Sequence, residues 1–152
     1  MTQDTEREIV ISRVIDGRRN LVFEAFTGED HLGRWWGPTG FTITTSQFEF
    51  TPGGIWEFVM HGPDGTDYPN SVRFAEITPP ERIVFLHGER ADDPNAFTSI
   101  ITLEDADGGT EVTLRSVFQT KEQRDTAIVE YHAVEGGEQT LGRLAEYLAG
   151  AG

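Results

Sequence analysis

The chain has 152 residues, a length that fits one domain able to bury its own core without the help of a disulfide or a metal. It contains no cysteine, which excludes disulfides, thiolate metal sites and a cysteine nucleophile. Its 12 Lys and Arg residues are outnumbered by 26 Asp and Glu residues, and the formal charge of −14 opposes nucleic-acid phosphates and anionic lipid surfaces.

The beginning of the chain, from Met1 to Glu8, is polar and lacks an apolar stretch, so no signal peptide is expected. No run elsewhere approaches the length of a membrane span. The sequence therefore predicts a cytoplasmic protein.

The first predicted elements are one strand and two short helices. Residues 7–15 are rich in Ile and Val and predict a strand, after which Asp16 offers a carboxylate to cap a helix that begins at Arg18. A second short helix is expected over residues 30–35 and is ended by Gly37-Pro38.

Six further strands are predicted after these helices, with Gly, Pro and Asp at the turns between them. They span residues 41–50, 54–60, 70–77, 82–88, 97–104 and 111–118. Strands that follow one another without intervening helices indicate an antiparallel meander. A helical pattern then covers residues 121–149.

One strand has an unusually large apolar face, because residues 54–61 alternate so that Trp56, Phe58 and Met60 point the same way. A curved sheet cannot leave this face in water, and the long C-terminal helix is the element available to cover it. We therefore expect an α+β fold in one domain, residues 1–152, with an ordered core over about residues 7–149.

Several runs carry a resemblance to a known family. They are residues 22–26 (VFEAF), 31–38 (HLGRWWGP), 52–58 (PGGIWEF), 80–85 (PERIVF) and 135–145 (EGGEQTLGRLA). The chain resembles the activators of the heat-shock-protein ATPase, in the calicheamicin-resistance-like branch of the START-like (SRPBCC) superfamily, over nearly its whole length. The resemblance implies a helix-grip fold, in which a curved antiparallel sheet wraps around the C-terminal helix and often leaves an apolar cavity.

The chain departs from the family pattern in one place. Relatives usually carry Ala-Pro where this chain has Gly17-Arg18, so the proline that pre-sets the first helical turn is missing. The family itself holds cochaperone domains and ligand binders, and the wider superfamily includes enzymes, so the fold does not select a function.

A ligand site is expected between the sheet and the C-terminal helix, although the same residues could instead fill a solid core. The candidate apolar wall consists of Trp36, Trp56, Phe58, Met60, Phe74, Phe85 and Leu141. Polar groups of the ligand would bind His87, Ser99, Ser116 and His132, with His87 and His132 placed to meet across the cavity.

A pair of glycines, Gly136 and Gly137, lies inside the predicted C-terminal helix, where each costs about 1 kcal/mol relative to alanine. Two interpretations remain open. The glycines mark a kink, or a break after a short helix that ends near Tyr131; alternatively, Gly137 leaves room for the ligand.

Chemical signatures are weak elsewhere. The four histidines have no metal-ligand spacing, and the acidic turn after residue 104 lacks the glutamate that a calcium loop needs at its twelfth position. The acid-base candidates Glu76, His87, Arg115 and His132 are too scattered to define a reaction. No cofactor, metal or catalytic residue is predicted.

Three functions stay open at this point. The first is a non-enzymatic module that binds a small apolar or aromatic molecule, as a monomer or homodimer, with no nucleic-acid or membrane partner. The second, implied by the resemblance, is a cochaperone-like domain that acts on a chaperone ATPase in a stress response. The third is a cyclase- or hydrolase-like enzyme that uses the cavity, and the sequence leans away from it because acid-base residues do not converge.

Overall fold

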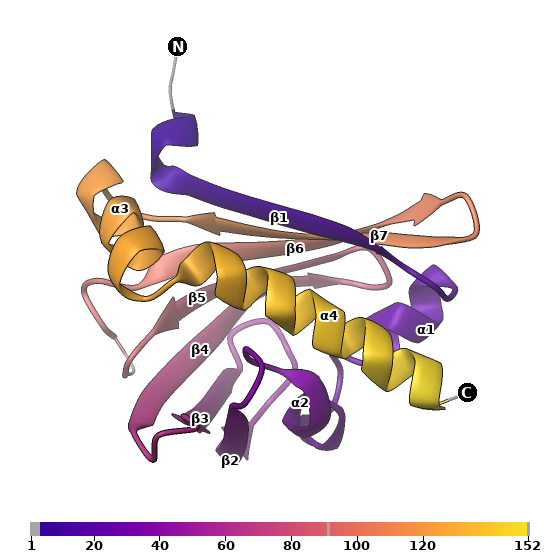
Figure 1. Cartoon of the computed structure of the whole chain (residues 1–152), viewed down its shortest axis with the longest axis horizontal. Helices are drawn as coiled ribbons and strands as arrows, with labels where there is room; N and C mark the ends of the chain where they lie inside the picture. The colour runs from indigo at the N-terminus through magenta and orange to yellow at the C-terminus, as the bar shows by residue number, and fades with distance from the viewer. Residues whose placement is uncertain (1–3, 91, 152) are drawn as a thin grey trace.

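The computed structural model describes residues 4–90 and 92–151, so the expected domain limits at Met1 and Gly152 lie outside the described residues. Seven strands form one antiparallel sheet in the order β1-β7-β6-β5-β4-β3-β2 (Figure 1). The strands are β1 (Glu8–Ile15), β2 (Thr42–Phe48), β3 (Ile55–His61), β4 (Asp67–Thr78), β5 (Arg82–Gly88), β6 (Phe97–Ala106) and β7 (Gly109–Val117).

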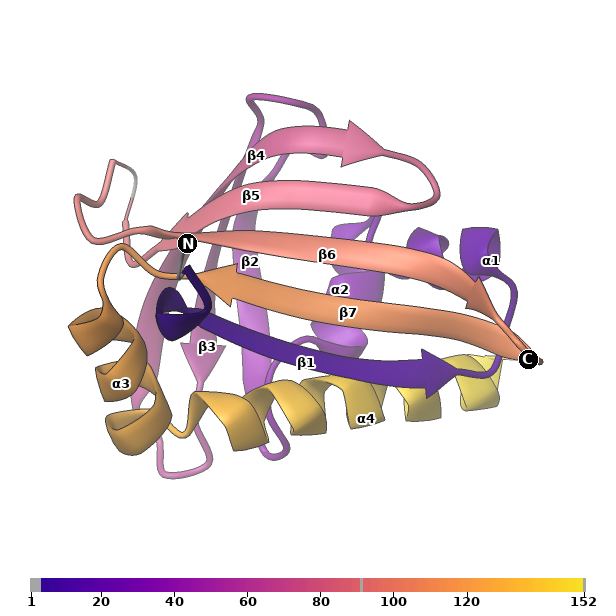
Figure 2. The same cartoon turned by 90° about the horizontal axis from the view of Figure 1, so that it is seen from above.

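Helices occupy the inside of the curved sheet and its ends. They are the 3-10 turn η1 (Asp4–Arg7), α1 (Arg19–Glu24), α2 (Glu29–Trp35), α3 (Lys121–Glu130) and α4 (Ala133–Ala151). Figure 2 shows β1, β7 and β6 running alongside α4, whereas β2 and β3 cross them, so the sheet wraps around the helix. The α+β helix-grip fold and the two short helices after the first strand are confirmed.

The predicted C-terminal helix is divided in two at Tyr131 and His132. His132 has a backbone φ of 52°, a left-handed conformation that stops α3 before α4 starts. The break therefore lies four residues before Gly136, and both glycines lie within α4. The interpretation of the glycine pair as the break itself is wrong, whereas a short helix that ends near Tyr131 is what the structure contains.

Two boundary predictions also need correction. Asp16 does not cap the first helix, because α1 starts at Arg19 and its N-cap residue is Arg18, which makes no side-chain capping bond. Strand β4 begins earlier than expected because Tyr68 and Asp67 pair with Met60 and His61 of β3.

The core is solid toward the C-terminal end of α4. Trp35, Trp56, Leu141 and Leu144 are all at most 2% exposed and belong to one apolar cluster with Phe74 and Phe85. The leucines lie on the apolar face of α4, and the aromatic rings of the strands lie at the alternate positions that point inward. In residues 4–90 and 92–151, no helix combines the length and apolar character needed to cross a bilayer.

Candidate ligand-binding site

The inner face of the sheet carries a short polar row between its aromatic residues. Antiparallel register pairs His87 with Val72, Phe85 with Ser99, and Ser99 with Ser116. Directly opposed residues share a face of the sheet, so His87 and the two serines lie on the same side as Phe85. Four of the expected site residues are thereby brought onto neighbouring strands of one surface.

His87 is held by a residue that the sequence analysis did not name. Its Nε2 lies 2.7 Å from Oδ1 of Asn70, and Nδ2 of Asn70 donates to the Tyr68 carbonyl at 2.9 Å. Strand alternation could have identified Asn70, because it lies two residues before Val72 and opposite Phe58.

Aromatic rings surround the imidazole of His87. The ring centroids of Phe97, Phe85 and Phe58 lie 5.1, 6.1 and 6.2 Å away. Burial among these rings lowers the pKa of His87 to about 4, so the imidazole is neutral at pH 7. The residue as a whole nevertheless keeps partial exposure, as a residue that borders a hollow does.

The two serines are polar groups without protein partners. Ser99 is 9% exposed and Ser116 is half-buried. Within the described part of the chain, neither hydroxyl makes a hydrogen bond to another protein group. Buried hydroxyls usually have such a partner, so these two are available to a bound molecule or to water.

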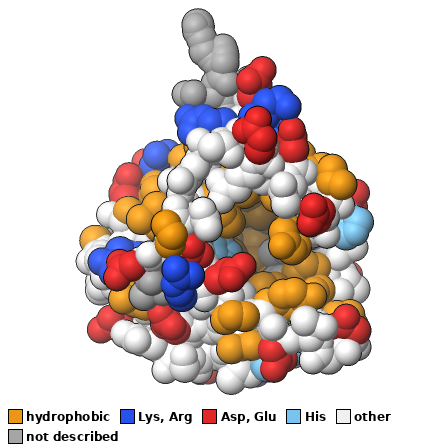
Figure 3. Space-filling view, turned by 90° about the vertical axis from the view of Figure 1, so that its left-hand side faces the viewer, with side chains coloured by type: hydrophobic (Ala, Val, Ile, Leu, Met, Phe, Trp, Pro, Cys, Tyr) orange, Lys and Arg blue, Asp and Glu red, His pale blue; other side chains and the backbone are white. Residues whose placement is uncertain are grey.

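The molecule is hollowed at the end where α3 lies. Figure 3 shows this end face, on which hydrophobic side chains line a depression near the centre and a histidine is visible at its wall. Met60, Phe97 and Leu114, which come from the inner face of the sheet, keep partial exposure, unlike the solid core at the other end. The interior thus changes from packed to hollow along α4.

The aromatic members of the predicted wall divide between these two regions. Trp36 is half-buried, and its ring lies 5.4 Å from that of Trp56, which stacks on Phe58 at 4.0 Å. Phe74 and Leu141 lie in the solid part, at 4% and 1% exposure. Phe58 is as deeply buried, at 2% exposure, but its ring lies 6.2 Å from that of His87, and Met60 keeps partial exposure.

Two expected site residues lie apart from this group. His132 is exposed at the break between α3 and α4, and no contact with His87 is found in the described structure. Gly137 leaves no room for a ligand, because a Cβ there would clash with Cδ1 of Ile11 on β1. The glycine allows α4 to approach the sheet closely, and Ile11 fills the space. The rotation of α4 about its axis decides this contact, and periodicity alone does not reveal it.

The loop that follows α2 is fastened to α4 by one arginine. Nη1 of Arg143 donates to the carbonyls of Gly37, Pro38 and Phe41 at 3.0, 3.1 and 3.1 Å, and more distantly to that of Trp36 at 3.4 Å. Gly37 has a φ of 104°, which allows the turn that gathers these carbonyls. Arg143 thus holds Trp36 beside the wall, a role that the sequence analysis missed.

The acid-base candidates do not converge in the structure. Glu76 accepts hydrogen bonds from Thr78 and Arg82, and Arg115 pairs with Glu8 at 3.4 Å. Strand parity places both Glu76 and Arg115 on the outer face, opposite His87. Across the described residues, no group of three or more His, Asp or Glu side chains is arranged to hold a metal ion.

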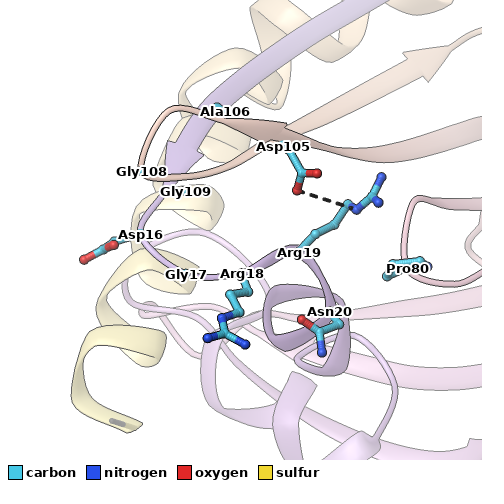
Figure 4. A pocket seen from close by; sticks show the side chains of 10 residues that line it. All are labelled: Asp16, Gly17, Arg18, Arg19, Asn20, Pro80, Asp105, Ala106, Gly108 and Gly109. Carbon is cyan, nitrogen blue, oxygen red and sulfur yellow. Dashed lines mark ion pairs between the residues drawn. The ribbon is translucent and has the colours of Figure 1, made fainter.

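A second depression, of about 650 Å³, lies among the turns at the opposite end of the molecule (Figure 4). Arg19 and Asp105 point toward one another there, with 3.8 Å between Nε and Oδ1, and Asp16 points away. The lining is mostly glycine and charged turn residues. Its lining contains no aromatic or large aliphatic side chain, so it is a weaker candidate for an apolar ligand than the inner face of the sheet.

Comparison with known proteins identifies relatives of the whole chain. The model of the family described as "Activator of Hsp90 ATPase homolog 1-like protein" matches residues 16–149. A crystal structure from Nitrosomonas europaea is 28% identical, with a TM-score of 0.88 and coverage of 98% of both chains. A solution structure from Arthrobacter aurescens is 25% identical, with a TM-score of 0.86, and covers 98% of this chain and 90% of its own. No curated protein matches the chain.

Proposed function

The chain belongs to the Activator of Hsp90 ATPase homolog 1-like family, and on this footing we propose that it is a non-enzymatic module that binds a small apolar or aromatic molecule between its sheet and α4. The START-like fold is generally that of ligand-binding or cochaperone-like modules. The ligand would contact the aromatic wall near Phe58 and Met60, and its polar groups would bind His87, Ser99 and Ser116.

The observation that carries this proposal is the pair of serine hydroxyls, Ser99 and Ser116, that have no protein partner within the described residues and lie on an apolar surface. An unsatisfied buried hydroxyl costs about 1–3 kcal/mol, and a core that needed only to be solid would place apolar side chains at Ser99 and Ser116. A ligand with polar groups would satisfy these hydroxyls. Under this proposal the ligand would enter through the hollowed end face.

Native mass spectrometry of the protein purified from cells tests for a co-purified small molecule. Titration with hydrophobic probes, followed by tryptophan fluorescence, tests binding directly because Trp36 and Trp56 adjoin the wall. Ser116→Leu fills the hollow from β7 and should abolish the fluorescence response. Thr113→Leu, which adds a leucine on the outer face of the same strand, should leave the response unchanged.

Two results of these experiments would contradict the binding proposal. If neither technique detects a bound molecule, or if Ser116→Leu binds every probe as tightly as the parent, the binding proposal is wrong. Equal loss in both variants, with lowered stability, would indicate general damage; circular dichroism and urea unfolding of each variant separate that case.

A second candidate function is favoured by the description of the matching family, which names an activator of the Hsp90 ATPase. In that case the determinants would lie on the outer surface, and Ser116→Leu would leave the activity intact. Purified protein would be added to a chaperone ATPase of the Hsp90 type. Absence of both stimulation and a complex on gel filtration would remove this candidate.

An enzyme that uses the cavity ranks third, because Glu76 and Arg115 face away from His87. We further propose a cytoplasmic protein, monomeric or homodimeric, without nucleic-acid or membrane partners. The charge of −14 supports the proposed absence of nucleic-acid and membrane partners, because it repels phosphates and anionic lipids. The narrower assignment to the calicheamicin-resistance-like branch stays a prediction.

A further inference from the structure

The protonation of His87 defines what its free nitrogen can recognise. Nδ2 of Asn70 donates to the Tyr68 carbonyl, which directs Oδ1 of Asn70, an acceptor, toward Nε2 of His87. Nε2 must therefore carry the proton and donate it. The neutral ring then has an acceptor lone pair on Nδ1, for which no partner exists within the described part of the chain.

Electrostatics around His87 disfavour an anionic ligand. Burial is the cause of the lowered pKa of His87, and no charged group contributes to that shift. A carboxylate placed here would lose its hydration without gaining a counter-charge. The lone pairs of the carboxylate would also repel the lone pair on Nδ1, because Nδ1 of the neutral ring accepts hydrogen bonds and cannot donate one.

The serines add adaptable polar contacts beside this acceptor. Ser99 lies opposite Phe85 on β5 and opposite Ser116 on β7, so the two hydroxyls form a short polar strip next to the phenylalanine rings. Each hydroxyl can donate or accept. The rings of Phe58, Phe85 and Phe97 suit the face or edge of an aromatic group.

We propose that His87 determines specificity, and that the ligand is an uncharged aromatic molecule whose hydroxyl group donates a hydrogen bond to Nδ1 of His87. This inference rests on the proposed binding function and narrows it to phenol-like compounds. Ethers lack the donor, and carboxylates lack both the donor and electrostatic compatibility.

A series of matched probes tests this chemistry at pH 7. The probes are 2-naphthol, 2-methoxynaphthalene, naphthalene and 2-naphthoate, titrated by calorimetry and tryptophan fluorescence. One neutral hydrogen bond contributes about 0.5–1.5 kcal/mol, so 2-naphthol should bind about 2- to 13-fold more tightly than 2-methoxynaphthalene. The carboxylate 2-naphthoate should bind most weakly.

The variant His87→Phe keeps a ring of similar size and removes the acceptor. It should reduce 2-naphthol affinity to that of 2-methoxynaphthalene while leaving the affinity for naphthalene nearly unchanged. The matched control is His61→Phe, because His61 bonds to Asp67 and Thr44 at 2.7 Å each on the outer face. This control should preserve the preference for 2-naphthol.

Imidazole ¹⁵N NMR of the parent protein provides a readout that does not depend on folding of a variant. The His87 signals should show a protonated Nε2 and an unprotonated Nδ1, and addition of 2-naphthol should shift the Nδ1 resonance while 2-methoxynaphthalene leaves it in place.

The outcomes separate the inference from the function on which it rests. If the neutral probes all bind with equal affinity, or 2-naphthoate binds best, the phenol inference is overturned while the binding function stands. If none of the four probes binds and no molecule co-purifies, the binding function itself fails. A protonated Nδ1 in the parent would also overturn the inference.

Discussion

His87 should make folding stability depend on pH. Its pKa is lowered from 6.5 to about 4 by burial, so between these values the unfolded chain binds a proton that the native state does not. Stability associated with His87 is complete above pH 6.5 and is lost progressively as pH falls toward 4. Between pH 7.5 and 5, the parent should lose about 1–2 kcal/mol relative to His87→Gln.

Urea unfolding of both proteins at the two pH values measures this difference. The 26 Asp and Glu residues titrate in both proteins, so their contribution cancels in the comparison. An unchanged difference in unfolding free energy between pH 7.5 and 5 would show that the His87 ring is hydrated in the native state.

Gly137 should tolerate alanine only if Ile11 gives way. A Cβ at residue 137 would meet Cδ1 of Ile11, which is the far end of a flexible side chain, whereas Gly142 on the same helix has its closest neighbour 3.7 Å away. Gly142→Ala should therefore stabilise by up to about 1 kcal/mol from helix propensity. Gly137→Ala should be nearly neutral, and Gly137→Leu should cost about 1–3 kcal/mol through overpacking.

A double-mutant cycle tests this contact. Ile11→Val deletes Cδ1, so Gly137→Ala should be more stabilising in the Ile11→Val background than in the parent. Independent effects of the two changes would show that the glycine and the isoleucine are not coupled. The sequence left two interpretations of Gly137 open because the contact depends on how α4 is rotated over the sheet.

At the scale of elements, Arg143 should be the main attachment of the loop after α2. Arg143→Met keeps much of the aliphatic stem and removes the donors to the carbonyls of Gly37, Pro38 and Phe41. Leaving these acceptors unsatisfied should cost about 1–3 kcal/mol of unfolding free energy. Arg34→Met, a change of an exposed side chain on α2, should stay within about 0.5 kcal/mol.

Hydrogen exchange locates the effect of this change. The amide of Phe41, which bonds to the Pro38 carbonyl, should exchange faster in Arg143→Met, whereas the amides of β6 and β7 should keep their protection relative to global unfolding. If the Phe41 amide keeps its protection, Arg143 does not hold the loop. The sequence analysis missed this attachment because every residue has a backbone carbonyl, and only the fold brings four of them to one guanidinium.

The elements themselves were largely predictable, for a physical reason visible at Trp56 and Phe58. Strand alternation repeats every two residues, so burial of these rings determines which face of each paired strand points inward. The same reasoning placed Phe85 and His87 correctly. The break at His132 was open in the sequence because a left-handed histidine has no distinct signal, and the nearby glycines gave a stronger one.

At the scale of the whole molecule, the order of elements predicts the fold better than the site. A meander followed by one long helix leaves few ways to cover a curved apolar face, and the helix-grip arrangement is one of them. How far the interior is filled depends on single contacts, such as that of Ile11 with α4. Periodicity therefore predicted the inner face of the sheet but not which part of it lies beside a hollow.

The net charge of −14 predicts that the protein has no measurable affinity for DNA or RNA at physiological salt. Nonspecific binding draws its free energy from counterions released when clustered Lys and Arg residues neutralise phosphates. Here several of the cations pair with acidic side chains, as Lys121 and Arg124 do with Asp125 at 2.9 Å each. A duplex should keep its electrophoretic mobility in the presence of micromolar protein at about 150 mM salt. Retardation that weakens as salt rises would mean that a basic surface forms despite the overall charge, and the partner would then have to be sought among polyanions.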